Sequence, residues 1–571
     1  MSRKREKRQG AGPNRTSSPY DDQNLAHKTD TLSPEMLRRL EFYGAIWTFD
    51  VDTTLFERGS RSVDLFVVLE GRMELFEDKA DMLRRCFASL TKGQFSGELD
   101  LLSGREALFS CRAAKGSRVL QIPFSALQQL TQTELDIADV IVRVWIGRRT
   151  DLMQRAHGGV VIVGHANDAE TMRMQQFLVR NGYPNRLIEA ESNATARLLL
   201  SGLNLDPSEM PVLFLPDQRV LRNPTNAVLA DELGISNVFE AEEIFDVAIV
   251  GAGPAGLAAA VYAASEGLRT IVLEGNAPGG QAGTSSKIEN YLGFPLGVTG
   301  QELASRAEIQ AQRFGARLEV SRNVVGILHP QGLHRLCLAG GRAVTSRTVV
   351  IATGARYRKL KVPGYERFEL KNIHYAATAI ETSRCVGHEV VVVGGGNSAG
   401  QAALHLSEQA HRVRLVVRGD ALNATMSDYL LQRICSSPRI SLHLNCEVEA
   451  VLGEEQLLCV EIRDHHSQER QVFSASNIFV MIGADPNTSW LEGNLDLDRS
   501  GFVRTGEAEW QPASKFATSY PGVFAIGDVR SGSVKRVASA VGEGSVVISD
   551  IHRYLEKSRL AEKDGPFVAR I

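Results

Sequence analysis

The sequence predicts a multidomain α/β protein, and three observations lead to that class. The chain has 571 residues, which is too long for a single hydrophobic core. Short apolar runs separated by turn residues fill the stretch from Gly44 to Pro123, as is typical of antiparallel strands. Two later segments, residues 245–274 and 390–418, each have the pattern of strand, glycine-rich turn, helix and strand. We therefore expect a β-rich N-terminal part followed by layered α/β domains.

Composition and charge narrow the possible function classes. Hydrophobic residues make up 43% of the chain and charged residues 23%, with a formal net charge of -3. This near-neutral balance argues against a nucleic-acid partner. No apolar run is long enough to span a membrane, and none follows the basic N-terminus as a signal peptide requires. The seven cysteines form no C-x-x-C pair and no metal-ligand spacing. We therefore expect a cytoplasmic protein with no metal site.

The N-terminal quarter divides into a tail and a β-rich unit. Residues 1–34 are polar and rich in basic side chains, so we expect a disordered, solvated tail. Residues 35–157 carry the predicted strands Phe66–Leu69, Met73–Phe76 and Arg118–Ile122, followed by a helix. Together with Gly71 and the triplet Gly97-Glu98-Leu99, this unit resembles the cyclic-nucleotide-binding β-roll of the catabolite activator family.

That resemblance implies a role for Glu98 and reveals a missing residue. In the family the glutamate binds the ribose of a cyclic nucleotide, and an arginine further on pairs with the phosphate. Here the place of that arginine falls near Ala107-Leu108, and Arg105 is out of register. Without the guanidinium a phosphate loses its bidentate partner. We therefore favour a β-roll that has lost cyclic-nucleotide binding over an active sensor.

The helix that ends this unit has an apolar stripe at helical spacing. The stripe consists of Ile137, Val140, Ile141, Val144 and Trp145. In the resembling family this position holds a dimer helix, but the stripe equally suits a helix packed on its own β-roll. Both alternatives stay open, and a homodimer is our expectation. The DNA-binding helix-turn-helix that often follows in that family is not evident.

Residues 158–240 resemble a thioredoxin fold. The expected strands are Val160–Val163, Arg186–Ile188, Val212–Leu215 and Arg219–Leu221. Helices are expected after the first, second and fourth of these strands, at Asp168–Asn181, Ala194–Gly202 and Asn226–Leu233. Pro211 matches the cis-proline of that fold. The place of its catalytic C-x-x-C has Gly164-His165-Ala166-Asn167, without sulfur. We favour a surface-loop histidine at His165 over a ligand at a vestigial site.

The first glycine motif lies between a predicted buried strand, Phe245–Val250, and a helix expected from Leu257 to Gly267. Gly251 suits the tight turn, Gly253 the close approach of a pyrophosphate, and Gly256 close packing of helix on strand. The helix N-terminus favours an anion. The next strand ends on Glu274, where an acid can bind a ribose hydroxyl. The motif therefore predicts a dinucleotide site.

From Phe245 onward the chain resembles the low-molecular-weight thioredoxin reductases over nearly all of its remaining length. Matches to flavin-side segments of that family occur at Pro278–Gln281, Glu289–Tyr291, Ile351–Gly354 and Gly522–Asp528. The resemblance implies an FAD-binding domain over residues 241–361 and 487–571. It also implies that FAD is bound by Gly251, Gly253, Pro254, Ala255, Gly256, Glu274, Gly280, Gln281, Asn290, Ala352, Thr353, Gly354, Gly527 and Asp528.

A second motif is nested between these segments, within a predicted NAD(P)H-binding domain at residues 362–486. Its strand ends on Arg418, where an acid would favour NAD and an arginine can accept the extra phosphate of NADP. Gly419 and Asn423 stand where the family has further arginines. We expect NADPH, with NADH as the alternative. The residues expected to bind it are Gly394, Gly396, Asn397, Ser398, Ala399 and Arg418.

The main departure from the family lies just before the second motif. Thioredoxin reductases carry C-A-T-C there, whereas this chain has Ala376-Ala377-Thr378-Ala379. Alanine cannot form the thiolate that attacks a disulfide. Cys385 lies nearby, and we favour a buried structural cysteine over a reactive one. The catalytic residues are therefore unknown.

Two functions follow from these features. The first is an enzyme in which NADPH reduces FAD and electrons pass to an unidentified acceptor or partner protein without an internal disulfide. The second is a redox- or nucleotide-responsive regulatory flavoprotein with little turnover, which the fused modules and absent cysteines suggest.

Overall fold

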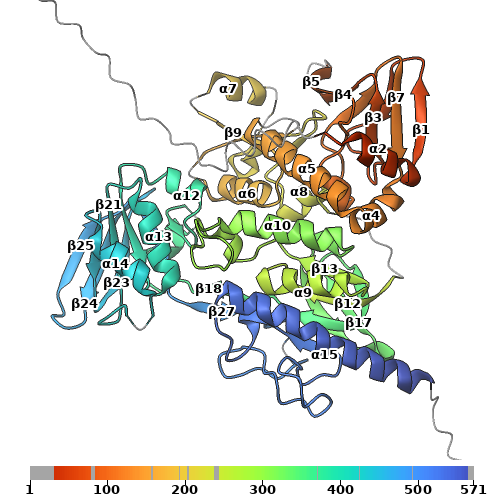
Figure 1. The fold of residues 1–571 in the computed structure, drawn as a ribbon. Coiled ribbons are helices and arrows are strands. Elements are labelled where there is room, and N and C mark those ends of the chain that lie inside the picture. Colours follow the sequence, from red (N-terminus) through yellow and green to blue (C-terminus); the bar gives the residue numbers. More distant parts are fainter. Residues whose placement is uncertain are drawn as a thin grey trace, which may run out of the picture.

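A computed structural model describes residues 31–563 except 79–83, 156–158, 167, 192, 202, 204, 237–242, 370, 424 and 492. Most of the expected disordered tail therefore lies outside the described residues, as does Asn167. Figure 1 shows the β-roll at the upper right, the sheet with β12 and β17 below the centre, and the sheet with β21 at the left. Within the described residues, no helix combines the length and apolar character needed to cross a bilayer.

The N-terminal unit consists of two small antiparallel sheets. One sheet has the order β1-β7-β3 and the other β2-β6-β4-β5. The strands are β1 (Ala45–Phe49), β2 (Thr53–Phe56), β3 (Leu65–Glu70), β4 (Met73–Asp78), β5 (Arg84–Leu90), β6 (Ser110–Ala113) and β7 (Ser117–Ile122). Its helices are α2 (Pro34–Leu40), α3 (Asp100–Ser103), α4 (Phe124–Thr133) and α5 (Leu135–Arg155).

Helix α5 resolves the alternatives for the apolar stripe. Ile137, Ile141 and Trp145 are fully buried, and they share one core cluster with β-roll residues such as Val67 and Leu120. The Trp145 indole also donates to the carbonyl of Ser96 at 3.1 Å. The stripe therefore packs on its own β-roll, so a homodimer would have to use another surface.

The next unit has a four-stranded sheet of order β11-β10-β8-β9. Strands β8 (Val160–Gly164) and β9 (Asn185–Glu189) are parallel, and β10 (Val212–Phe214) and β11 (Val220–Arg222) are added antiparallel. The Met210–Pro211 peptide bond is cis, as expected. The helices are α6 (Ala169–Arg180), α7 (Ala194–Leu200) and α8 (Asn226–Glu232). We call residues 159–236 the thioredoxin-like unit, after the fold that the sequence leads us to expect here.

The central sheet of the C-terminal half has the order β14-β13-β12-β17-β16-β15, and β28 also pairs with β17. The strands are β12 (Ile244–Val250), β13 (Thr270–Glu274), β14 (Arg317–Val320), β15 (Val324–Leu328), β16 (His334–Leu338), β17 (Ala343–Ile351) and β28 (Val523–Ala525). Helices α9 (Pro254–Ser265), α10 (Gly300–Arg313) and α15 (Val537–Lys563) cover it. The pairing of β28 with β17 brings the end of the chain back beside the first glycine motif.

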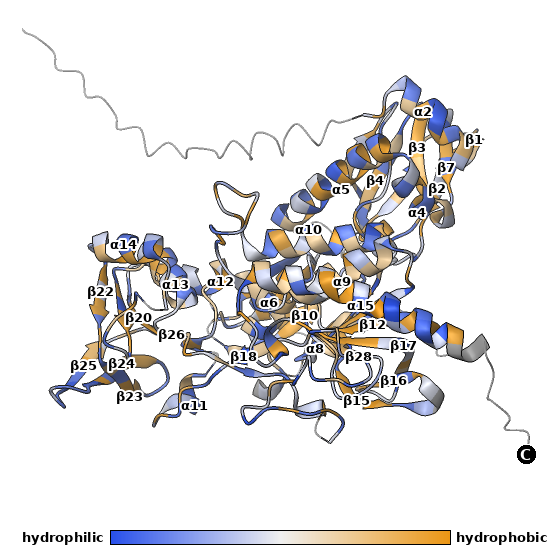
Figure 2. Ribbon diagram, turned by 60° about the horizontal axis from the view of Figure 1, so that its bottom comes forward, coloured by the Kyte–Doolittle hydropathy of each residue, from blue (hydrophilic) through white to orange (hydrophobic). Residues whose placement is uncertain are grey.

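Helix α9 begins at Pro254, three residues before the expected start at Leu257. The expectation was wrong because Gly253 is the N-cap and Pro254 occupies the first helical position, where a missing backbone N–H costs nothing. Figure 2 shows α9 in strongly hydrophobic colours. Its small apolar residues are buried on nearly all sides, which lets α10 and α15 pack closely against it.

A second parallel sheet, with order β19-β26-β20-β21-β22, lies between the two segments of this half. Its strands are β19 (Ile373–His374), β20 (Glu389–Val393), β21 (Arg412–Val416), β22 (Ile440–His443) and β26 (Asn477–Val480), with helices α12 (Ala379–Ser383), α13 (Asn397–Ser407) and α14 (Asp428–Ser436). A meander of β23 (Cys446–Gly453), β24 (Leu457–Asp464) and β25 (Arg470–Ser474) adjoins it. We call this the nested domain. The paired strands β18 (Ala355–Tyr357) and β27 (Ala484–Pro486) connect it to the central sheet.

Candidate dinucleotide sites

The first glycine turn is shaped by the strand next to it. Gly251 has φ +103°, and a Cβ there would lie 2.4 Å from the carbonyl oxygen of Ala352. Only glycine therefore permits this close approach of the turn to the end of β17. The turn places the N-terminus of α9 at the carboxyl ends of the parallel strands, where α/β sheets bind nucleotides.

The N-terminus of α9 is open toward one side. No side chain caps it, whereas Ser, Asp, Asn or Thr side chains cap helices such as α2, α6, α7, α8 and α10. A Cβ on Gly253 would meet nothing closer than 4.0 Å, and the nearest atom is the Cα of Gly280. First-turn amides have no partner within their own helix. The space and the free donors therefore fit a pyrophosphate.

Glu274 stands where the motif predicts, at the end of β13. One carboxylate oxygen accepts the Ala252 amide at 2.8 Å, and the other accepts the Asn276 amide at 2.9 Å. The side chain thus ties the glycine turn to the loop after β13. Since a carboxylate has further lone pairs, it can still accept a ribose hydroxyl.

The other FAD-side residues mostly converge on this turn. Gly280 lies against Gly253, and Gln281 donates to the carbonyl of Ala355. Thr353 donates to the Asn487 carbonyl at 2.9 Å, and the Asn487 amide donates back to Thr353 at the same distance. A Cβ on Gly354 would meet nothing within 4 Å.

The C-terminal segment completes the group, with one exception among the predicted residues. A Cβ on Gly527 would lie 2.9 Å from the Cβ of Ala255, so this turn meets the start of α9. Asp528 beside it is half-buried, and burial raises its pKa while Lys535 opposes the rise. Asn290, in contrast, is exposed, and no hydrogen bond within the described residues ties its side chain to this group.

The second motif repeats the geometry of the first. Gly394 has φ +140°, and a Cβ there would lie 2.4 Å from the carbonyl oxygen of Met481 at the end of β26. Gly396 is the N-cap of α13, again without a side-chain cap. Asn397 accepts the Ser427 amide at 2.7 Å, and Ala399 is buried in the domain core. The first turn of α13 therefore offers a second open anion site.

Arg418 follows the end of β21, as predicted. It is exposed, and its guanidinium forms no ion pair or hydrogen bond within the described part of the chain. Its position at the carboxyl end of the parallel strand suits a phosphate on an adenosine ribose bound at this edge. Because no carboxylate occupies it, the guanidinium is available for such a group.

A pocket at the junction of the two domains lies between the sites. It is a small pocket, partly open to solvent, and is lined on one side by Thr284, Ser285 and Tyr357 and on the other by Ala376, Ser398 and Gln401. Burial raises the pKa of the Tyr357 phenol, while a hydrogen bond to Ser398 opposes the rise. Sequence reasoning missed Tyr357 and Gln401, because neither belongs to a motif and only the folded chain brings them together.

Comparison with known proteins agrees with this geometry. The profile of the pyridine nucleotide-disulphide oxidoreductase family matches residues 245–544, which is more than half of the chain. The chain belongs to this family. The profile of the cyclic nucleotide-binding domain matches residues 46–134, in the β-roll. The predicted class, a thioredoxin reductase-like flavin oxidoreductase behind a cyclic-nucleotide-binding-type domain, is thereby confirmed.

Thioredoxin reductases are among both the curated relatives and the solved structures that resemble this chain. The chain is 33% identical over 366 residues to NADPH-dependent thioredoxin reductase 3 of Arabidopsis thaliana, covering 60% of this chain and 66% of that protein. It is 34% identical to the thioredoxin reductase of Mycolicibacterium smegmatis, covering 55% and 97%. Crystal structures of the Lactococcus lactis enzyme in its FR conformation and of the T. acidophilum enzyme each match with a TM-score of 0.51, at 27% and 30% identity, covering 55% of this chain and 99% of theirs.

Ala376 and Ala379, which stand at the two cysteine positions of the family, have different surroundings. Ala376 lines the junction pocket, whereas Ala379 is exposed at the start of α12. Cys385 is fully buried, its thiol donates to the Glu381 carbonyl at 3.4 Å, and burial raises its pKa to about 12. A thiol so protonated is a poor nucleophile, which favours the structural role.

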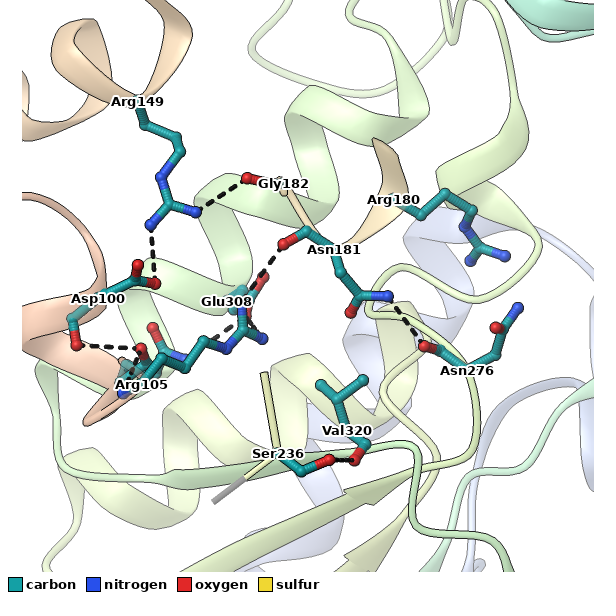
Figure 3. A network of polar contacts seen from close by, with 12 residues as sticks. Asp100, Arg105, Arg149, Arg180, Asn181, Gly182, Ser236, Asn276, Glu308 and Val320 are labelled. Carbon is teal, nitrogen blue, oxygen red and sulfur yellow. Dashed lines mark hydrogen bonds and ion pairs between the residues drawn. The ribbon is translucent and has the colours of Figure 1, made fainter. Parts of the chain in front are cut away.

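In the β-roll, the Glu98 carboxylate is already paired with an arginine of the same chain. Arg149 of α5 donates to Glu98 at 2.6 Å and forms an ion pair with Asp100 at 2.7 Å, and all three side chains are buried or nearly so. Burial raises the pKa of Glu98, and Arg149 opposes the rise. Arg105 pairs with Glu308 of α10 at 3.2 Å (Figure 3). Glu98 and Arg105 line a small cavity of the β-roll, and Arg149 and Arg105 are each neutralised by a carboxylate.

Proposed function

We propose that this oxidoreductase takes reducing equivalents from NADPH through FAD and delivers them to an acceptor without an internal redox disulfide. The observation that carries the proposal is the junction pocket, where Ser398 of the second glycine motif faces Thr284 and Ser285 of the flavin half and Ala376 stands in place of a sulfur. When bound, the nicotinamide supplies hydride and the flavin accepts it. The chain's part is to bind the two, align them and limit the access of water.

The first motif is proposed to hold FAD. The α9 amides at Gly253 and Ala255 donate to the pyrophosphate, and Glu274 accepts from the adenosine ribose. Asp528, brought to the start of α9 by Gly527, accepts from the ribityl hydroxyls. The proposed domain spans residues 241–361 and 487–571.

The second motif is proposed to hold NADPH within residues 362–486. The amides at Gly396 and Ser398 face the pyrophosphate, and Arg418 binds the phosphate of the adenosine ribose. NADH lacks that phosphate and leaves Arg418 without an ionic partner, so it is the poorer donor.

The N-terminal units are proposed to be regulatory or architectural rather than catalytic. The tail is assigned to residues 1–34, the β-roll with α5 to 35–157 and the thioredoxin-like unit to 158–240. Since Arg149 is paired with Glu98 and Arg105 with Glu308, neither of these two guanidinium groups is free to bind a cyclic phosphate. We place the protein in the cytoplasm, in keeping with its unpaired cysteines.

The test follows NADPH consumption by the full-length holoenzyme with three acceptors: oxidised thioredoxin, a soluble quinone analogue and dioxygen. We expect turnover with the quinone or dioxygen and none with thioredoxin. An ordinary C-x-x-C thioredoxin reductase serves as the positive control for the thioredoxin assay. Steady reduction of thioredoxin by this chain would contradict the proposal.

A second candidate is a flavoprotein regulator with little turnover, and one observation favours it. The Arg105–Glu308 ion pair joins the β-roll cavity to α10, which packs against the loop at Ala282–Thr284 in the flavin half. This function predicts slow flavin reduction and a partner whose binding changes on reduction. Fast multiple turnover would exclude it.

A further inference from the structure

Helix α6 of the thioredoxin-like unit contacts the nested domain. The Gln176 amide donates to a carboxylate oxygen of Glu381 at 2.5 Å. Glu381 is only 2% exposed, and its other oxygen accepts the Thr378 amide at 2.9 Å to cap α12. In both ribbon views α6 and α12 lie side by side (Figures 1 and 2). The contact therefore joins α6 to an element whose own cap depends on the same carboxylate.

The loop after β8 makes a second contact with the same helix region. The Arg384 guanidinium, just beyond α12, donates to the carbonyl of Ala166. Glu189 fixes that loop, because it accepts the Ala166 amide at 3.1 Å and lies 3.3 Å from the His165 ring. Burial lowers the pKa of Arg384, while Glu381, Cys385 and Glu189 oppose the fall.

The same helix also holds the loop of the FAD-side site. Arg180, one turn after Gln176 and therefore on the same face, donates to the carbonyl of Gly280 at 3.0 Å. The Asn181 amide donates to the carbonyl of Asn276 at 3.1 Å, as Figure 3 shows. One face of α6 thus binds the nested domain and the FAD-side loop at once.

Both contacts between the thioredoxin-like unit and the nested domain lie beside positions where the resembling families have catalytic cysteines and this chain has none. Helix α12 begins at Ala379, and the loop His165-Ala166 stands at the C-x-x-C place of the thioredoxin-like unit. We propose that this unit is seated on the side of α12 that carries Glu381 and Arg384, here called the α12 face, as a built-in occupant fastened by Gln176 and Arg384. Ala379 at the start of the helix stays exposed, but the seated unit keeps a separate thioredoxin-like protein from docking on the α12 face.

The seating of this unit also limits which acceptors can be reduced. In that respect it rests on the proposed function. With the unit seated there, we infer that the acceptor is a small molecule that enters the junction pocket beside Tyr357 and Ala376, rather than a protein disulfide. The unit also links the nested domain to the FAD-side loop, so that the contact with α12 resists rotation of one domain against the other.

Hydrogen exchange of the full-length holoenzyme tests the seating directly. The Gln176→Ala, Arg384→Ala double variant removes both contacts, while Gln175→Ala on the same helix removes a neighbouring glutamine that donates no hydrogen bond within the described residues. We expect amides of residues 376–386 to exchange on the order of tenfold faster in the double variant than in wild type. We expect no change in the control. Equal exchange in the double variant and the control would overturn the proposal.

A binding measurement gives an independent answer if the double variant folds poorly. The probe is a thioredoxin with its second active-site cysteine replaced by serine, added to the wild-type holoenzyme. We expect no binding and no added protection of residues 376–386. Binding with protection there would show an open face. Since neither measurement uses turnover, failure of flavin reduction by NADPH would refute the proposed function and leave the seating intact.

Discussion

The two glycine motifs of this chain have the same backbone geometry, but the residue at or just beyond the end of the second strand is acidic at one site and basic at the other. At each, a glycine with positive φ sits where a Cβ would lie 2.4 Å from a carbonyl of the neighbouring strand, at Ala352 for Gly251 and at Met481 for Gly394. Each precedes a helix without a side-chain cap. The second strand of the unit then ends in Glu274 at one site and leads to Arg418 at the other.

Glu274 and Arg418 therefore differ in role: Glu274 helps to build the fold, whereas Arg418 is proposed to select the nucleotide. Glu274 accepts two backbone amides and so helps to build the turn beside it. Arg418 is exposed and forms no ion pair within the described residues, so we expect its removal to leave the fold intact. The backbone geometry is thus common to both sites, and we propose that the charge beside it distinguishes an adenosine hydroxyl from an adenosine phosphate.

The largest expected effect is the loss of flavin from Gly251→Ala. The new Cβ meets the Ala352 carbonyl, so the turn shifts and the pyrophosphate site is lost. We expect protein purified without flavin absorbance. The control is Gly267→Ala, which also has positive φ (+82°) but has nothing within 4 Å of its Cβ. Loss of flavin from both variants would mean that backbone strain, rather than close approach, is responsible.

Gly394→Ala is expected to separate the two sites. The variant should keep its flavin, because the first motif is untouched, but its KM for NADPH should rise by roughly 30-fold, as for a clash costing about 2 kcal/mol. Gly387→Ala, whose Cβ meets nothing within 4 Å, is the matched control. Flavin loss from Gly394→Ala would show that the sites are not independent.

Arg418→Ala is expected to change the choice of nucleotide. One charge-assisted contact to phosphate contributes about 1.5–3 kcal/mol, so the KM for NADPH should rise by roughly 10- to 100-fold. The KM for NADH should stay the same. Arg412→Ala removes an exposed arginine at the opposite end of β21 and should alter neither. Equal losses with NADPH and NADH would assign Arg418 a merely structural role.

The smallest effect is expected for Cys385→Ser. With its pKa raised to about 12 by burial, the thiol stays protonated at pH 8, and iodoacetamide should not label it in the folded protein. The exposed Cys435 should be labelled under the same conditions. Rates of NADPH oxidation should match wild type. Labelling of Cys385 in mass spectra, or a large loss of rate, would identify it as redox active.

Restoring the two cysteines of the family tests whether their loss alone prevents the reduction of thioredoxin. The Ala376→Cys, Ala379→Cys double variant regains the C-x-x-C spacing, but the Gln176–Glu381 contact between α6 and α12 remains. We expect it to remain inactive toward oxidised thioredoxin in an insulin-coupled assay. Substantial activity would show that loss of sulfur alone, and not the covered face, keeps thioredoxin out.

The sequence predicts local features well because they depend on local chemistry. The glycine turns, Glu274 and Pro211 follow from backbone and motif requirements within a few residues. The start of α9 was misplaced because the signal of Pro254 at the first helical position was overlooked. The pairing of Glu98 with Arg149, the contact of Gln176 with Glu381 and the place of Tyr357 were not predictable, since each joins residues distant in the chain with no repeating pattern.

The most direct test of the central claim is anaerobic mixing of the purified holoenzyme with NADPH, and separately with NADH, while the flavin absorbance is followed. The account predicts rapid bleaching by NADPH and slower bleaching by NADH at equal concentration. Fully oxidised flavin after mixing with either nucleotide, with FAD bound, would contradict it.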